Sequence, residues 1–152
     1  MPYTNAEGRQ QVLDDLAAAI EDLAVALANV GEAYEQLDES AAQRLEDELF
    51  RPLQLASGQA QRTYTGFAGR HGFPPRVFAA ASPHVREHDA KGIIENAAAA
   101  VARADMRIAE LQDSMLPIEV GDPQLRAGLE QVRVLLGDTG ARSREITRII
   151  GR

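Results

Sequence analysis

The sequence predicts an all-α protein, folded as an up-down-up-down four-helix bundle in a single domain of residues 1–152. Three observations predict this fold. Apolar residues recur at intervals of three and four along four segments of roughly thirty residues each. Capping residues precede these segments. No segment shows the alternating pattern of a strand. Helices of similar length joined by mostly short connections favour antiparallel neighbours around one core.

The composition limits the functions that the chain can have. Hydrophobic residues make up 45% and charged residues 26%, as in ordinary globular proteins. The absence of cysteine excludes disulfides, thiolate metal sites and cysteine nucleophiles. A net charge of −7 disfavours nucleic acid as a partner. With neither a signal-peptide pattern nor an apolar stretch of membrane-spanning length, we expect a cytoplasmic protein with no membrane partner.

The first helix is expected from about residue 5 to about residue 37. Thr4 and Glu7 have the spacing of a capping box at its start. Its apolar residues follow the heptad pattern of a helix packed nearly parallel to its neighbours. This seam comprises Leu13, Leu16, Ile20, Leu23, Leu27, Val30, Tyr34 and Leu37.

A second capping box, Ser40 with Gln43, is expected to start the second helix. Pro52 lies inside this helix and crowds the carbonyl of Glu48, so we expect a kink or a break there. Glycines and prolines then end the helix, and residues 72–82 form the longest connection, between helices 2 and 3. The expected core residues are Ala42, Leu45, Leu49, Ala56, Ala60, Thr63 and Phe67.

The third and fourth helices are expected to begin with the same signal, a capping residue followed by proline. These pairs are Ser82-Pro83 and Asp122-Pro123. The third seam comprises Ala90, Ile94, Ala97, Val101, Ala104, Ile108, Leu111 and Met115. The fourth comprises Leu125, Leu129, Val132, Leu136, Thr139, Ser143, Ile146 and Ile150. The pattern leaves open whether the fourth helix is continuous or divided at residues 137–140.

Cofactor sites common in helical bundles are not expected. A di-iron site needs inward carboxylates and Glu-x-x-His motifs, but the chain has no such motif and the seams of helices 1 and 4 have no carboxylate. For haem, Met115 is the one ligand candidate in a seam, and its position favours core packing. A glycine-rich phosphate loop, a Ser-His-Asp order and a paired-carboxylate cleft are not recognisable either. We therefore expect no cofactor and no catalytic residue.

The segment from His84 to His88 contains H-x-x-E-H, the residue order of the inverted zinc-protease motif. Histidines four residues apart on a helix can share one metal ion. Relative to the third seam, however, both imidazoles fall on the solvent face. Two solvated histidines are the preferred interpretation, and a surface metal site at His84 and His88 is kept as an alternative.

The overlapping residues His88-Asp89-Ala90-Lys91-Gly92 read H-x-x-K-G. This short motif resembles the core of histidine phosphotransfer domains, which are acidic helical bundles. The resemblance implies that His88 accepts a phosphoryl group, that Lys91 offsets its charge and that Gly92 admits a response regulator. Ala90 departs from the larger hydrophobic residue that the family carries before the lysine. A phosphotransfer-like signalling bundle is therefore a second alternative, carried by five residues of 152.

The segment 49–86 contains no Asp or Glu but has five arginines. Its charge is therefore +5, against −12 for the rest of the chain. It also holds five of the seven aromatic residues. One interpretation is an ordinary helix and loop whose aromatics lie in the core. The other is a basic, partly apolar patch that binds an acidic partner or ligand. The candidate partner-binding residues are Arg62, Arg70, His71, Phe73, Arg76 and Phe78.

Together these features predict a non-enzymatic helical interaction protein that self-associates, as a homo-oligomer such as a dimer. The acidic remainder of a second copy is the nearest surface that could complement the patch. An acidic protein partner is the other candidate.

Overall fold

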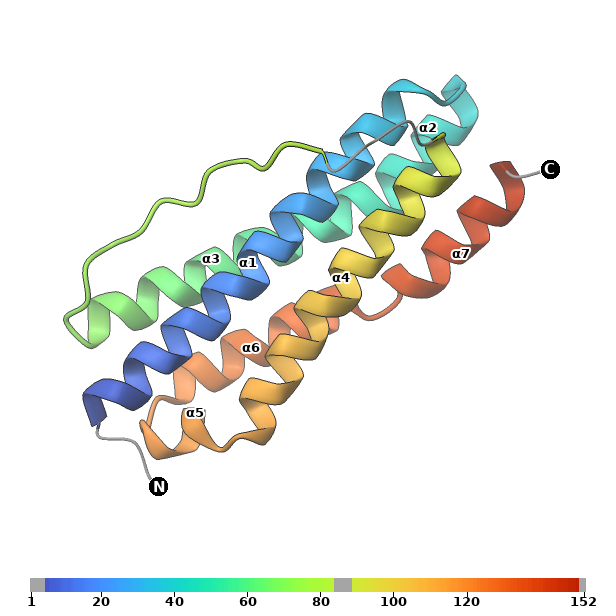
Figure 1. Ribbon diagram of the computed structural model, residues 1–152. Coiled ribbons are helices and arrows are strands. Elements are labelled where there is room, and N and C mark those ends of the chain that lie inside the picture. The colour runs from blue at the N-terminus through green and yellow to red at the C-terminus, as the bar shows by residue number, and fades with distance from the viewer. Residues whose placement is uncertain (1–4, 84–88, 151–152) are drawn as a thin grey trace.

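The computed structural model describes residues 5–83 and 89–150, and every regular element within them is helical. The elements are α1 Asn5–Glu35, α2 Glu39–Leu45, the π-helix η1 Glu46–Phe50, α3 Arg51–Arg70, α4 Ala90–Asp113, α5 Leu116–Glu119, α6 Pro123–Leu136 and α7 Thr139–Ile150. They pack side by side into a bundle with one apolar core (Figure 1). The predicted all-α bundle is confirmed.

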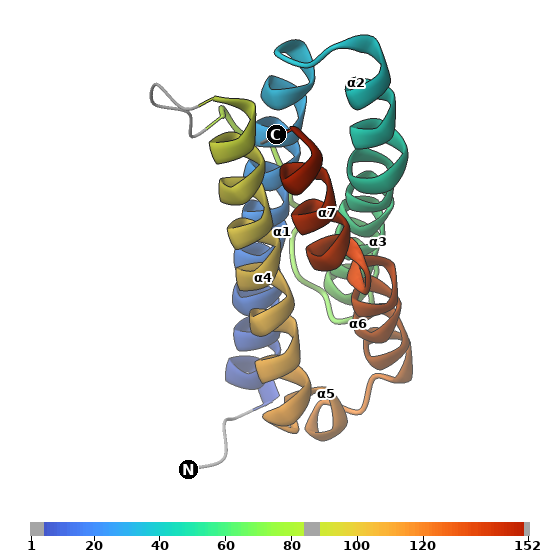
Figure 2. The same ribbon diagram turned by 90° about the vertical axis from the view of Figure 1, so that its right-hand side faces the viewer.

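Each long helix packs against two antiparallel neighbours. α1 contacts α3 and α4, α6 contacts α3, and α7 contacts α4 (Figure 2). The direction of α4 is fixed by its contacts with α1. Asp22 binds Arg107 with a distance of 2.7 Å, whereas Val30, further along α1, lines a small cavity with Ala97. Since the residue numbers rise along one helix and fall along the other, α1 and α4 are antiparallel.

This direction differs from the expected up-down-up-down order, in which the first and third long helices are parallel. The connection after α3 runs back along the outside of the bundle (Figure 1), so that α4 runs in the same direction as α3. The order is therefore up-down-down-up with one long crossover. Residues 73–83 are extended, and eleven residues at about 3.3 Å each span about 36 Å. That equals the length of the 24-residue α4 at about 1.5 Å per residue.

The core face of α1 follows most of the predicted seam, but Leu27 and Leu37 are only partly buried. Leu13, Leu16, Ile20, Leu23 and Val30 are buried, as expected.

Tyr34 was expected in the core and is 41% exposed. A hollow lies between the last turn of α1 and Phe50, and Tyr34 lines it. Thr4, the expected cap of α1, lies outside the described residues.

The second helix begins earlier than its expected capping box. Asp38 caps α2, and its Oδ1 accepts a hydrogen bond from the backbone N–H of Ala41 at 2.8 Å. Ser40 therefore lies within the first turn, and the amide of Gln43 donates to Asp47 instead of reaching back to a cap. The box was wrong because Asp38, an aspartate with extended backbone two residues earlier, already caps the helix and so begins it at Glu39.

The irregularity expected at Pro52 is a π turn rather than a break. In η1, the N–H of Arg51 donates to the carbonyl of Glu46, five residues earlier. Pro52 follows in the first turn of α3. Pro52 has no N–H to donate, but the helix is not interrupted there. The helical path therefore continues from α2 to the end of α3.

The crossover begins in a Schellman motif. Gly72 has a φ of 76°, and the N–H of Phe73 donates to the carbonyl of Ala68 at 2.8 Å.

The expected start of the third helix at Ser82-Pro83 is wrong, because both residues belong to the extended connection. α4 begins at Ala90, where Asp89 accepts a hydrogen bond from the N–H of Gly92 at 3.0 Å. Here again an aspartate directly before the helix provides the cap.

Of the remaining helix boundaries, the end of α4 differs from the prediction and the start of α6 agrees with it. Met115 was expected in the core, but α4 ends at Asp113 and Met115 turns outward with a φ of 68° and an exposure of 49%. Asp122 and Pro123 begin α6 as predicted. The fourth helix is divided, because residues 137–138 form a turn between α6 and α7.

Candidate functional site

Two residues of the predicted patch, Arg70 and His71, converge on Asp122 at the start of α6. The carboxylate of Asp122 is 4% exposed. Its Oδ2 accepts hydrogen bonds from Arg70 Nε at 3.0 Å and pairs with His71 Nε2 at 2.8 Å. Its Oδ1 accepts from Arg70 Nη2 at 3.0 Å and from the N–H of Leu125 at 2.9 Å. The cluster therefore joins the end of α3 to the start of α6.

The charge of Asp122 is stabilised by these bonds. Burial by itself raises the pKa of the carboxyl, but the N–H of Leu125 and the side chains of His71 and Arg70 together hold that pKa below its usual value. The imidazole of His71 also lies against Phe67, with ring centroids 4.4 Å apart. Arg70 and His71 are therefore directed towards a partner within the chain.

The crossover residues Arg76 and Phe78 are also bound internally. Arg76 Nη2 lies 2.8 Å from Glu21 Oε1 on α1, and the guanidinium lies over the Phe78 ring, 4.8 Å from its centroid. Phe78 meets Tyr64 of α3 edge to face, at 5.1 Å between centroids. Phe73 also packs against the core, half-buried. The segment 73–83 is therefore anchored on both α1 and α3.

Arg62 is the remaining member of the predicted patch. It is exposed on α3 and donates a hydrogen bond to Gln59 at 3.3 Å. The structure thus brings together Arg70 with His71 on Asp122, and Arg76 with Phe78, where Arg76 binds Glu21.

The alternative histidine sites are only partly described. His84 and His88 lie outside the described residues. Lys91 is exposed in the first turn of α4. Within residues 5–83 and 89–150, no group of three or more His, Asp or Glu side chains is arranged to hold a metal ion.

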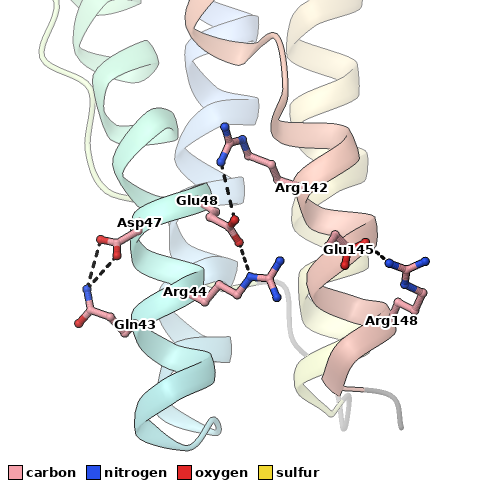
Figure 3. A network of polar contacts seen from close by, with 7 residues as sticks. All are labelled: Gln43, Arg44, Asp47, Glu48, Arg142, Glu145 and Arg148. Carbon is pink, nitrogen blue, oxygen red and sulfur yellow. Dashed lines mark hydrogen bonds and ion pairs between the residues drawn. The ribbon is translucent and has the colours of Figure 1, made fainter.

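A polar network connects the second helix to α7 (Figure 3). Glu48 accepts a hydrogen bond from Arg44 Nε at 2.7 Å, and its other oxygen lies 3.8 Å from Arg142 Nη1. Gln43 with Asp47 and Glu145 with Arg148 form further pairs, each within one helix. Pairs of this kind on a surface each contribute about 0–1 kcal/mol, so the network positions α7 more than it stabilises the fold.

A hollow that was not predicted from the sequence lies at the same end of the bundle. It has a volume of about 230 Å³, lies between α1 and η1, and is lined by Val30, Gly31, Tyr34, Glu35, Glu46 and Phe50. Neither Glu35 nor Glu46 has an ion-pair partner among the described residues. The hollow therefore combines aromatic walls with two unbalanced carboxylates.

The surrounding chain is strongly acidic. Residues 1–48 contain twelve Asp and Glu against two arginines, a net charge of −10. This part of the sequence supplies α1, α2 and most of η1. This excess of acidic residues is visible in the sequence. It was overlooked because the charge of segment 49–86 was compared with that of all the other residues taken together.

Comparisons of the chain with models of known protein families, with curated proteins and with solved structures gave no match. Within the described residues, no helix combines the length and the apolar character needed to cross a membrane. The geometry of the bundle itself carries the functional argument.

Proposed function

We propose that the protein is a non-enzymatic helical interaction protein whose acidic end binds basic protein surfaces, a second copy of the chain among them. The observation that carries this proposal is the hollow between α1 and η1. There the exposed ring of Tyr34 lies beside Glu35 and Glu46, which have no ion-pair partner in the described part of the chain. Apolar surface next to unbalanced charge is typical of interaction sites.

A second copy offers complementary charge on α6 and α7. Arg126 and Arg144 are exposed on these helices, and neither forms an ion pair within the described residues. Arg70 and Arg76 of the expected basic patch already bind Asp122 and Glu21. These internal pairs favour the outer faces of α6 and α7 over segment 49–86 as the basic counterpart.

Sedimentation equilibrium at about 100 μM tests self-association, with salt raised from about 0.1 M to about 1 M. We expect a dimer at low salt that weakens at high salt, because shorter screening lengths reduce attraction between exposed charges. The double variant Glu35→Gln with Glu46→Gln removes two surface charges worth about 0.5–1 kcal/mol each. Its dissociation constant should rise about tenfold.

The matched control is Glu95→Gln with Glu119→Gln, which makes the same change in net charge on α4 and α5. It should leave the dissociation constant within about twofold of the wild type. A monomeric wild type at low salt would defeat self-association. An equal response of both double variants would show that net charge, not the acidic end, governs the contact.

A further inference from the structure

A groove runs along one side of the α1–α3 pair, and the crossover fills only part of it. In the filled half, Phe78 and the following alanines line a hollow of about 380 Å³ together with residues of α1 and α3. The open half is the hollow of about 230 Å³ beside Tyr34. Phe50 lines both hollows. On α1 the lining residues Ala24, Ala28, Gly31 and Glu35 are spaced four, three and four apart, which places them on one face.

The filled half shows what chemistry the groove binds. The occupant is an extended segment of this chain, residues 73–83. Its Arg76 binds a carboxylate of α1, Glu21, at 2.8 Å. Two residues later, Phe78 packs against the groove and against Tyr64. Recognition therefore combines an arginine on a helix carboxylate with an aromatic ring placed two residues further on.

The open half repeats these features. Glu35 on α1 and Glu46 on η1 offer carboxylates, and Tyr34 and Phe50 offer rings. Glu35 lies fourteen residues beyond Glu21, which corresponds to about 21 Å along α1. An extended segment of about six residues covers that length.

Gly31 keeps the floor of the open half low. A Cβ at this position would meet no atom within 4 Å, so the packing of the chain on itself does not require glycine. Glycine inside a helix costs about 1 kcal/mol relative to alanine. The residue therefore leaves space over the groove at a position where the monomer gains nothing from that space.

We propose that the open half of this groove binds an extended segment of a partner protein, in which an arginine precedes an aromatic residue by two positions. This rests on the proposed interaction function and names the chemistry of the partner. A separate protein is favoured over a second copy, because in the described residues the one extended segment of this length, 73–83, already lies in the filled half.

The probe is a fluorescein-labelled peptide with the sequence of residues 73–79, FPPRVFA, titrated with the full chain and followed by fluorescence polarisation. We expect saturable binding to the wild type. Gly31→Leu, which fills the open half and replaces glycine by a good helix former, should weaken binding at least tenfold, about 1.4 kcal/mol. Glu35→Gln with Glu46→Gln should weaken it similarly. Glu95→Gln with Glu119→Gln should leave it unchanged, and a peptide with arginine replaced by glutamate should not bind.

The outcomes separate this inference from the proposed function. Binding that is lost in Gly31→Leu, while circular dichroism shows unchanged helix content, supports the inference. Absence of binding, or equal binding to Gly31→Leu, overturns it, and a salt-dependent dimer would then leave the proposed function standing. If the unlabelled peptide dissociates that dimer, the groove belongs to a second copy and a separate partner is rejected. Absence of both peptide binding and dimer rejects both proposals.

Discussion

In the part of the chain that the structure describes, three aspartates cap the starts of helices, and one of them also joins two helices. Asp38, Asp89 and Asp122 each accept a hydrogen bond from the backbone N–H three residues later. Asp122 in addition binds Arg70 and His71, which lie about fifty residues away in the sequence. At this residue, a local capping preference and a contact between distant segments depend on the same carboxylate.

Replacing Asp122 by asparagine should separate these two roles. Asparagine caps a helix about as well as aspartate, so the local effect is small. The loss of charged hydrogen bonds to partly exposed Arg70 and to His71 should lower the free energy of unfolding by about 1–3 kcal/mol. Urea denaturation measures this change. Asp89→Asn, the same substitution at a cap without distant partners, should stay within about 0.5 kcal/mol. Equal effects at both positions would contradict the role assigned to the cluster.

The same carboxylate should make stability depend on acid pH. Because the folded-state pKa of Asp122 lies below its usual 3.8, its stabilisation is complete above that value and is lost as pH falls through the folded-state pKa. The pKa of Asp15 shifts the opposite way, because burial raises it more than the hydrogen bond from Gln11 lowers it. Asp15 contributes equally to the wild type and to Asp122→Asn, so its contribution cancels in the difference between their free energies of unfolding. This difference should shrink between about pH 5 and pH 2, and a constant difference would contradict the account.

At the level of helices, periodicity predicted faces well and ends poorly. Leu23 in α1 and Leu129 in α6 are fully buried, as their seams predict. Tyr34 and Met115 belong to the same patterns and are exposed: Tyr34 lies in the last turn of α1, beside a hollow, and Met115 lies beyond the end of α4. A repeating pattern indicates which side of a helix is apolar, but the packed neighbours decide where that side stops being covered.

Close packing of α3 on α6 depends on a glycine that the sequence analysis did not single out. A Cβ at Gly128 would lie 2.3 Å from Thr63 Oγ1 and 2.8 Å from its Cγ2. Gly128→Ala should therefore destabilise the protein by about 1–3 kcal/mol, although alanine is the better helix former. Gly31→Ala is the matched control, and it should be neutral or stabilise by up to about 1 kcal/mol, since its Cβ meets open space.

A double variant tests the contact itself. Adding Thr63→Ala to Gly128→Ala removes the crowding atoms, so the two substitutions should cost less together than the sum of their separate effects. Thermal unfolding of the four proteins measures this coupling. Strict additivity would show that Thr63 and Gly128 do not limit the approach of α3 to α6.

At the level of the whole molecule, the up-down-up-down order predicted from the sequence differs from the observed order of helix directions. An apolar stripe reads alike in both directions, and a connection that includes residues 73–83 is long enough either to turn back or to cross the bundle. The crossover places Arg76 beside Glu21, 55 residues away, just as the bundle places His71 beside Asp122. The basic and aromatic residues of the predicted patch could therefore be identified from the sequence. The residues that they contact could not, because the fold brings them together from distant parts of the chain. The hollow beside Tyr34 was not predictable, because it exists where the crossover does not cover the groove.

The crossover order is the central claim, and one distance measurement tests it most directly. The chain has no cysteine, so spin labels can be attached to introduced cysteines alone. Gln10, Gln36 and Lys91 are exposed. Gln36 directly follows α1, and Gln10 lies about 39 Å away along that helix. Pulsed electron paramagnetic resonance on Gln36→Cys with Lys91→Cys should give a distance within about 20 Å, and Gln10→Cys with Lys91→Cys one near 40 Å. A short distance from residue 10 and a long one from residue 36 would restore the up-down-up-down order and remove the groove.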